Sequence, residues 1–234
     1  MNKVTAEIRK RLFELGEKEY GDFQAGLIPE LDRKQMLGVR APSLKSLAKE
    51  LACKKDISLF LSELPHYYHE ENMLHVYILS FAHDYSECIT LIKDFLPFVE
   101  NWAVCDSLRP KCFEAHRAEL KEEIYDWLSS SDIYTVRFAV EMLMIHYLEE
   151  DFQTDFLCKV SEIVSGEYYL NMMLAWYFAT ALAKRWNETI SFLEQRKLSE
   201  WVHKKTIQKA IESNRISEDR KIYLKQIRRE GYEK

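Results

Sequence analysis

Glycine, proline and long apolar runs are all scarce in this sequence. Its 234 residues include only 6 glycines and 5 prolines, too few for the many tight turns that a protein of short strands needs. No uninterrupted apolar stretch reaches the roughly 18–20 residues of a membrane-spanning helix. The charged segment 1–20 also lacks the apolar centre of a signal peptide. These absences favour a helical, intracellular protein, and we expect no membrane association.

The cysteines suggest neither a disulfide framework nor a zinc site. There are five of them, an odd number, and no two have the Cys-x-x-Cys spacing of structural zinc ligands. We therefore expect reduced thiols and no bound metal. Four histidines between residues 66 and 83 lie close to Glu70 and Glu71. Their spacing differs from that of a helical zinc motif, so structural or surface roles are the favoured interpretation.

The overall charge gives no sign of nucleic-acid binding. With 33 basic and 38 acidic residues the net charge is −5, so any contact with nucleic acid requires a locally basic surface. Apolar residues make up 47% of the chain and charged residues 30%, which is ordinary for a folded protein. The length is sufficient for a large buried core.

Apolar residues recur at helical spacing along almost the whole chain. Pro42 suits the first turn of a helix, and Leu44, Leu47 and Leu51 follow on one face. Similar patterns predict further helices over residues 5–16, 70–82, 86–98, 101–115, 117–128, 132–147, 152–164, 168–184, 189–195, 199–214 and 217–229. We find neither the alternation of a strand nor a hairpin dipeptide.

The predicted helices form pairs that recur about every 35–45 residues and are joined by short polar links. That spacing is typical of HEAT and armadillo repeats, in which each helical pair buries its apolar face on its neighbours. It predicts an all-α fold, an α-solenoid whose curved inner surface is available for function. No low-complexity linker divides the chain, so we expect a single domain over residues 1–234.

Three segments place polar or aromatic residues on otherwise apolar helices. Trp102 and Asp106 are four residues apart, so they share one face of a helix. Arg137 lies among apolar neighbours, and Trp176 ends a run rich in tyrosine and methionine. A carboxylate beside an indole, with Arg109 close by, is costly in a core and useful in a site. These segments are the candidate functional residues.

The three segments, in this order on successive helices, resemble the bacterial DNA alkylation repair glycosylases of the AlkD type. The similarity lies in the W-x-x-x-D motif of Trp102 and Asp106, in Arg137, and in Trp176. The Gly-Val-Arg-Ala-Pro turn at residues 38–42 is similar to that family's early turn into a helix. The resemblance covers nearly the whole chain. It implies a right-handed solenoid of HEAT-like repeats, C-shaped, with a concave groove for duplex DNA.

The function that this resemblance implies is base excision repair. A DNA glycosylase of this type hydrolyses the N-glycosidic bond of alkylated, cationic purines, such as 3-methyladenine and 7-methylguanine, in double-stranded DNA. Asp106 would stabilise the cationic sugar and position water, while Trp102 and Trp176 would hold the sugar and the lesion. Arg137 would bind a phosphate. The resemblance implies no metal or organic cofactor, and a monomer in the bacterial cytoplasm whose substrate is nucleoid DNA.

Further basic residues are candidates for DNA contacts because they cluster in the sequence. Besides Arg109 they are Lys184, Arg185, Lys204, Lys205 and Lys209. Clustered cations on one surface would supply the salt-dependent affinity that DNA binding requires. They are equally compatible with the solvated face of a terminal helix.

Each candidate also has an ordinary structural interpretation. Asp106 and Arg109 are three residues apart and can form an exposed intrahelical ion pair. Arg137 can pair with Glu141 one turn later, and tryptophan is usually well buried in a core. The alternative function is therefore a non-catalytic helical-repeat protein. It would bind damaged or branched nucleic acid, or a protein partner, through its concave face.

Overall fold

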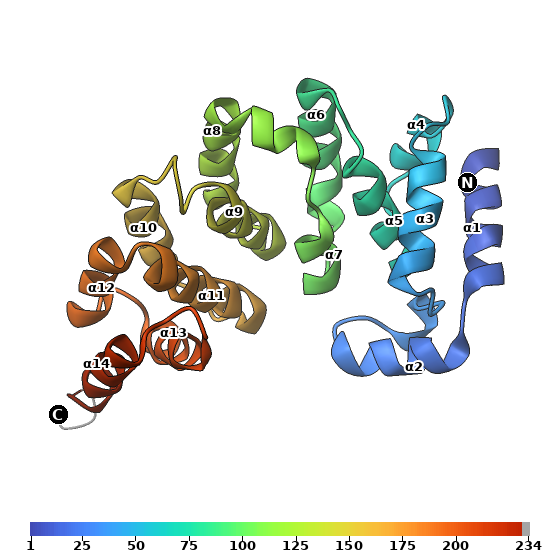
Figure 1. Ribbon diagram of the computed structural model, residues 1–234. Helices are drawn as coiled ribbons and strands as arrows, with labels where there is room; N and C mark the ends of the chain where they lie inside the picture. Colours follow the sequence, from blue (N-terminus) through green and yellow to red (C-terminus); the bar gives the residue numbers. More distant parts are fainter. Residues whose placement is uncertain (231–234) are drawn as a thin grey trace. The chain divides into compact units, whose positions relative to one another are not determined.

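The computed structural model describes residues 1–230, and helix dominates them (Figure 1). Helix accounts for 71% of the structure, and no strand occurs in the described part. The α-helices are α1 Lys3–Leu15, α2 Lys18–Leu27, α3 Ala41–Leu51, α4 Ser58–Leu61, α5 His69–Leu79, α6 Tyr85–Phe95, α7 Trp102–Ser107, α8 Arg117–Leu128, α9 Ile133–His146, α10 Thr154–Ser161, α11 Tyr168–Lys184, α12 Trp186–Glu194, α13 Glu200–Glu212 and α14 Glu218–Glu230. Three short 3-10 helices cover Arg33–Gln35, Leu96–Phe98 and Lys111–Ala115. The predicted all-α fold is confirmed.

Side-chain acceptors mark where several helices begin. A side-chain oxygen of the N-cap residue accepts the N–H of the residue three positions later in α1, α6, α7 and α9; these caps are Asn2, Asp84, Asn101 and Asp132. Each cap satisfies one amide that the helix itself cannot, which is worth about 1 kcal/mol. The starts of these helices are thus set locally by the sequence.

The chain divides into two compact units, Met1–Leu120 and Lys121–Lys234. In the first, which we call unit 1, α5 lies between α3 and α7 and contacts both (Figure 1). The α1 helix packs on α4 and α5. Fully or almost fully buried side chains join these helices, among them Leu12, Leu44, Phe60, Leu74 and Phe95.

A buried carboxylate joins α5 to the turn that leads into α3. Glu70 is completely buried, and its side chain accepts the backbone N–H groups of Leu37 at 2.9 Å and Gly38 at 2.7 Å. Burial raises the pKa of Glu70, while these hydrogen bonds act in the opposite direction. Gly38 has φ +81°, a conformation in which a Cβ is strained. The turn therefore depends on a glycine and an acceptor that are distant in sequence.

The second unit, which we call unit 2, repeats one arrangement of helices. The second helices of successive pairs, α9, α11 and α13, lie side by side, with α11 in contact with the other two (Figure 1). Helix α12 packs on α10 and α11. The core between them includes Phe138, Phe156, Tyr177, Phe178 and Leu193. Helices packed on their neighbours in this way are typical of an α-solenoid, whereas the right-handed twist and the C shape stay predictions.

Two sequence expectations are tested directly by these elements. Within the described residues, no helix combines the length and the apolarity needed to cross a membrane. The segment 101–115, predicted as one helix, is instead divided into α7 and a 3-10 helix. Pro110 explains the break, because a proline disfavours helical backbone in the residue before it. Leu108, with ψ 94°, has already left the helix.

Candidate functional site

The segment that carries Trp102 and Asp106 is the short helix α7, and its first turn is held by Asn101. The Asn101 side chain is buried and accepts the N–H of Val104 at 3.0 Å. Val104 and Cys105 point into the core, whereas Trp102 and Asp106 remain partly exposed. The two candidate residues therefore share a helix, as their spacing predicted, and lie on its accessible side.

Trp102 is fixed by a contact with a distant helix. Its indole Nε1 donates a hydrogen bond to the backbone oxygen of Leu27, at 3.2 Å. Leu27 is the last residue of α2, where carbonyl groups have no partner within the helix. The indole therefore satisfies a helix end and, in return, loses its freedom to rotate.

Asp106 lies at the edge of a cavity of about 360 Å³, which we call the Asp106 cavity. Its lining comes from α3, α5, α7 and the residues after α7: Lys45, Tyr77, Ser80, Phe81, Asp106, Ser107 and Arg109. The Arg109 Nε donates to the backbone oxygen of Asp106 at 3.0 Å. Arg109 is outside α7, so this contact caps the end of the helix rather than joining two side chains within it.

Two lysines lie beside aromatic rings that line this cavity. The Lys45 Nζ lies 5.4 Å from the ring centre of Tyr77, and the Lys111 Nζ lies 5.9 Å from that of Phe81. Tyr77 is almost buried, and burial raises its pKa, so its hydroxyl stays protonated at neutral pH. Cations beside aromatic rings favour an anionic, planar ligand such as a nucleotide.

Arg137 and Trp176 belong to unit 2 and differ in exposure. Arg137 on α9 is only 5% exposed, and its guanidinium donates to the backbone oxygen of Tyr169 on α11. Trp176, also on α11, is 38% exposed. The tryptophan is therefore available to a ligand, whereas the arginine links two neighbouring helices and offers little of its surface.

Lys184 and Arg185 contact the link between α9 and α10. The Lys184 Nζ forms an ion pair with Glu149 at 2.7 Å. Arg185 donates to the backbone oxygens of Leu148 and Glu149, and its guanidinium lies 5.1 Å from the ring centre of Phe152. Both side chains thus have a structural role, and their predicted contact with DNA stays a prediction.

The three lysines of α13 differ in their surroundings. Lys204 pairs with Glu200 one turn earlier. Lys205 lies 5.7 Å from the ring centre of Trp201. The pKa of Lys209 is lowered, first by burial and then by the charge of Lys205, while the charge of Glu212 raises it and that of Arg137 lowers it. Lys205 and Lys209 are four residues apart on α13, so these two lysines form a cluster of like charge on one side of the helix, which favours a bound anion.

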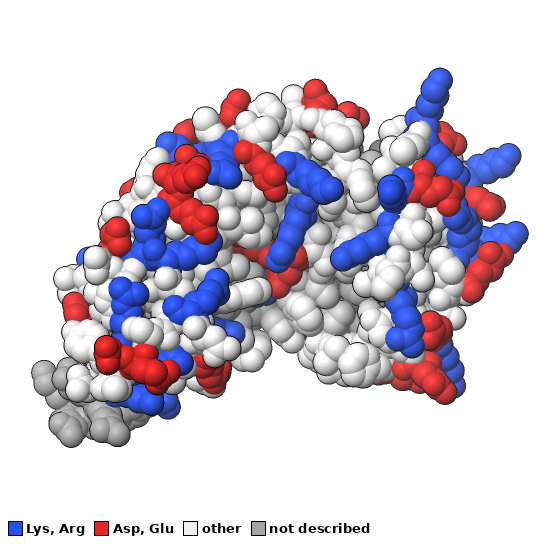
Figure 2. Space-filling model, in the orientation of Figure 1, with Lys and Arg blue, Asp and Glu red and all other residues white. Residues whose placement is uncertain are grey.

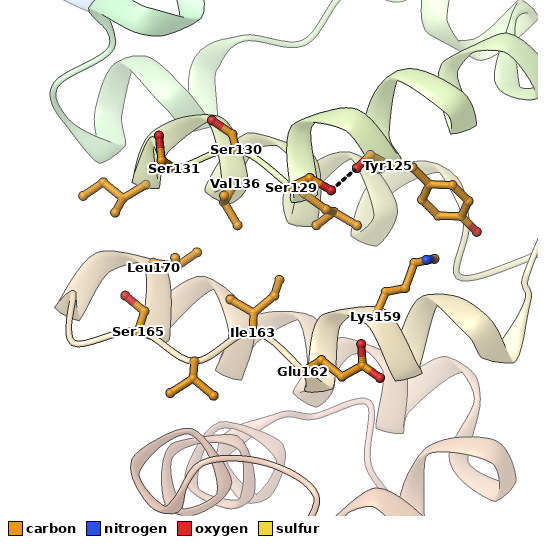
Figure 3. Close-up of a pocket in the computed structure, with 13 residues that line it drawn as sticks. Tyr125, Ser129, Ser130, Ser131, Val136, Lys159, Glu162, Ile163, Ser165 and Leu170 are labelled. Atoms are coloured by element: carbon orange, nitrogen blue, oxygen red, sulfur yellow. Dashed lines mark hydrogen bonds between the residues drawn. The ribbon is translucent and has the colours of Figure 1, made fainter.

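Figure 3 shows a cavity of about 480 Å³, which is larger than the Asp106 cavity. It lies in unit 2, where the serine turn 129–131 faces Lys159, Glu162 and Ile163. None of the candidate site residues lines it. The candidate site residue Asp106 therefore lines the smaller of these two cavities.

The sequence was compared with those of known protein families. The sequence matches the family described as DNA alkylation repair enzyme over residues 5–212.

The chain belongs to the DNA alkylation repair enzyme family.

Among the curated proteins, none matches the sequence. Family membership makes the protein an enzyme of DNA repair and confirms the resemblance drawn from Trp102, Asp106, Arg137 and Trp176. The individual roles of those residues stay predictions.

Two histidines of this enzyme, His66 and His75, belong to the core of unit 1. His66 Nε2 lies 2.9 Å from His75 Nδ1, and both rings are buried. The ring of His66 stacks on Phe60 at 4.5 Å, and that of His75 stacks on Phe95 at 4.1 Å. Burial lowers the pKa of His66 to about 4, so this pair is neutral at pH 7. The predicted structural role is confirmed for these two residues.

Sequence reasoning missed Lys45 and Tyr77 as parts of the site. Lys45 occupies the exposed side of α3, opposite the apolar stripe that predicted the helix. Tyr77 belongs to α5, in which almost every residue is buried. Neither has a distinguishing pattern in the sequence, because only the packing of α3 and α7 on α5 brings them to Asp106.

Proposed function

We propose that this enzyme is a DNA glycosylase that removes alkylated, cationic purines from duplex DNA, with 3-methyladenine and 7-methylguanine as representative lesions. One observation carries the proposal. The carboxylate of Asp106 lines a cavity together with the basic residues Lys45 and Arg109. The family supplies the substrate class, alkylated DNA. A carboxylate next to basic residues can stabilise the positive charge that develops on the sugar, while the basic residues bind the phosphates.

In the proposed reaction the sugar, rather than the departing base, is the group that needs stabilisation by the enzyme. An alkylated purine already carries positive charge, so it leaves as a neutral base with little acid catalysis. As the bond from C1′ to the purine nitrogen breaks, the electron pair goes to the base and positive charge develops on the sugar. Asp106 stabilises that charge and accepts a proton from the water that attacks C1′. The products are the free base and an abasic site, and the proton passes to solvent.

We propose that Trp102 and Trp176 contact the substrate through the faces of their rings. Trp102 is held in place by Leu27 and is partly exposed beside Asp106 on α7, so it is suited to contact the sugar. Trp176 is proposed to contact the DNA from unit 2. Attraction between an aromatic face and a cation contributes about 0.5–2 kcal/mol, depending on how far water is excluded.

The basic candidates are not equally suited to bind phosphate. Lys205 and Lys209 belong to the cluster of like charge and are proposed as the principal contacts from unit 2. Arg109 is proposed as the phosphate contact from unit 1, because it lines the Asp106 cavity. Arg137 is buried, Lys184 and Lys204 are paired with carboxylates, and Arg185 donates to two backbone oxygens, so we expect smaller contributions from them. Arg109 and Lys205 also donate to carbonyl oxygens, those of Asp106 and Gln208, but such neutral contacts are weaker than a pair with a carboxylate.

The decisive experiment is the release of free base from methylated duplex DNA. Wild type is compared with Asp106→Asn, which keeps the size of the side chain, and with Asp94→Asn. Asp94 is an exposed aspartate of unit 1 on α6. We expect Asp106→Asn to lose about 100-fold or more in rate, as for removal of a general base. Asp94→Asn should match wild type.

Two results would contradict the proposal in different ways. If wild type releases neither 3-methyladenine nor 7-methylguanine above the spontaneous rate, the glycosylase function is wrong, and a binding role remains. If wild type and Asp106→Asn release base equally fast, the activity stands and the role given to Asp106 is wrong.

A further inference from the structure

Two aromatic side chains of unit 2 form an exposed corner beside the cluster of lysines. Tyr168 begins α11 and is 55% exposed, and Trp201 on α13 is 39% exposed. Their ring centres are 5.8 Å apart and their planes meet at 72°. The two rings therefore pack edge to face, and each keeps part of its surface exposed. We call this pair the Tyr168–Trp201 corner.

The corner is built by the packing of α11 on α13, two helices that lie side by side (Figure 1). Trp201 follows directly on the first residue of α13, and its neighbours Val202 and His203 are buried. Tyr168 has a second aromatic neighbour, Tyr169, at 5.1 Å. The backbone at Trp201 is therefore fixed by buried neighbours, that at Tyr168 by the buried Leu170 two residues later, and both rings remain partly exposed.

Positive charge lies directly beside this corner. The Lys205 Nζ is 5.7 Å from the ring centre of Trp201, and Lys209 lies four residues further along the same helix. Figure 2 shows lysine and arginine side chains over the part of unit 2 where α11 and α13 lie in Figure 1. Exposed aromatic rings flanked by cations are typical of surfaces that stack unpaired bases and bind the adjoining phosphates.

We propose that the Tyr168–Trp201 corner holds an unpaired base of the DNA, with Lys205 and Lys209 on the phosphates beside it. In a paired duplex the faces of each base are covered by its neighbours, so a ring can stack only on a base that has left the helix. A damaged or vacated position supplies such a base at low cost, since its pairing is already weakened. The inference rests on the proposed function only in taking DNA as the ligand.

The test compares two DNA duplexes that differ by one unpaired nucleotide. One is fully paired, and the other carries a single-nucleotide bulge in the same sequence. Affinities are measured by fluorescence anisotropy at one fixed salt concentration. We expect wild type to prefer the bulged duplex. Trp201→Ala should lower affinity for the bulged duplex about 10-fold and for the paired duplex about twofold or less, in line with the loss of one stacked base.

Companion variants separate stacking from other effects. Tyr168→Ala removes the other wall of the corner from a different helix, so it should cause the same selective loss. Trp201→Phe keeps an aromatic face and should retain most of the preference for the bulge. Trp186→Ala is the matched control, because Trp186 also has a cation over its ring, Arg220 at 4.7 Å, but lies on α12. It should bind both duplexes like wild type.

Several outcomes would overturn the inference. Equal losses on the bulged and paired duplexes would show that the rings contact a groove or the backbone and do not stack on a base. If neither Trp201→Ala nor Tyr168→Ala lowers the affinity for DNA, the corner does not belong to the DNA-binding surface. Base release by the same proteins tests the proposed function independently. An active wild type without selective loss in the variants refutes the corner alone, and selective loss with an inactive wild type refutes the glycosylase alone.

Discussion

Replacing Gly38 with alanine should destabilise the enzyme severely, and the structure allows the cost to be worked out. A Cβ at this position would lie 2.1 Å from the backbone oxygen of Glu17 and 2.6 Å from the backbone nitrogen of Gly21. Both obstacles are main chain, so α2 must move away from the turn. In addition, the φ of +81° at Gly38 is unfavourable for alanine and destabilises the folded state by roughly 1–2 kcal/mol.

The movement of α2 also breaks hydrogen bonds that converge on this turn. Glu17 donates its N–H to the Gly38 oxygen at 3.1 Å. The Gly38 N–H in turn donates to the buried carboxylate of Glu70 at 2.7 Å. A neutral hydrogen bond contributes about 0.5–1.5 kcal/mol and one to a charged group about 1.5–3 kcal/mol. With the backbone strain, we expect Gly38→Ala to lower the free energy of unfolding by about 3–6 kcal/mol.

Gly26→Ala is the matched control. Gly26 lies inside α2, and no atom approaches within 4 Å of the position that its Cβ would take. Alanine there should raise stability by roughly 0.5–1 kcal/mol, because glycine loses more conformational entropy in a helix. For a chain of this size the expected shift in Tm for Gly38→Ala is about −10 °C. Thermal and urea unfolding followed by circular dichroism measure both variants. A Gly38→Ala protein as stable as Gly26→Ala would refute the reasoning.

Two further predictions concern pH and salt. Burial lowers the pKa of His66 and of His69 to about 4. As the pH falls below about 6.5, these two histidines therefore become protonated in the unfolded chain but stay neutral in the folded one. The free energy of unfolding should then decrease between about pH 6.5 and pH 4, by up to about 2.7 kcal/mol per pH unit for the two groups together. A urea midpoint unchanged between pH 7 and pH 5 would contradict this. Lys205→Ala should reduce the slope of log affinity for duplex DNA against log salt by about 1, whereas Lys204, which is paired with Glu200, should matter less. Equal changes for both lysines would exclude the special position of Lys205.

Much of the fold could be predicted because its determinants are local. The apolar stripe of Leu44, Leu47 and Leu51 specifies a helix face, and Asp132 supplies the acceptor that begins α9. Helix α11 has the bounds predicted for it, Tyr168–Lys184. The short α4, Ser58–Leu61, was missed because four residues are too few to show a helical period.

The candidate site was predictable only in part. The spacing of Trp102 and Asp106 placed them on one helix face, which depends on local backbone geometry alone. The burial of Arg137 was not predictable, since its partner is a backbone oxygen of Tyr169 that has no sequence signature. A similar contact engages Arg185 with the backbone of Leu148. Basic residues that look alike in a sequence are distinguished by acceptors that only folding brings to them.

The sequence by itself determined most of the helices, the caps of four of them, and a family resemblance carried by four residues in order. The tertiary structure decided which side chains meet. Packing of α3 and α7 on α5 brings Lys45 and Tyr77 to Asp106, and packing of α11 on α13 brings Tyr168 to Trp201. The physical reason is that helix formation depends on residues three or four apart, whereas a site depends on contacts between helices whose sequence separation carries no periodic signal.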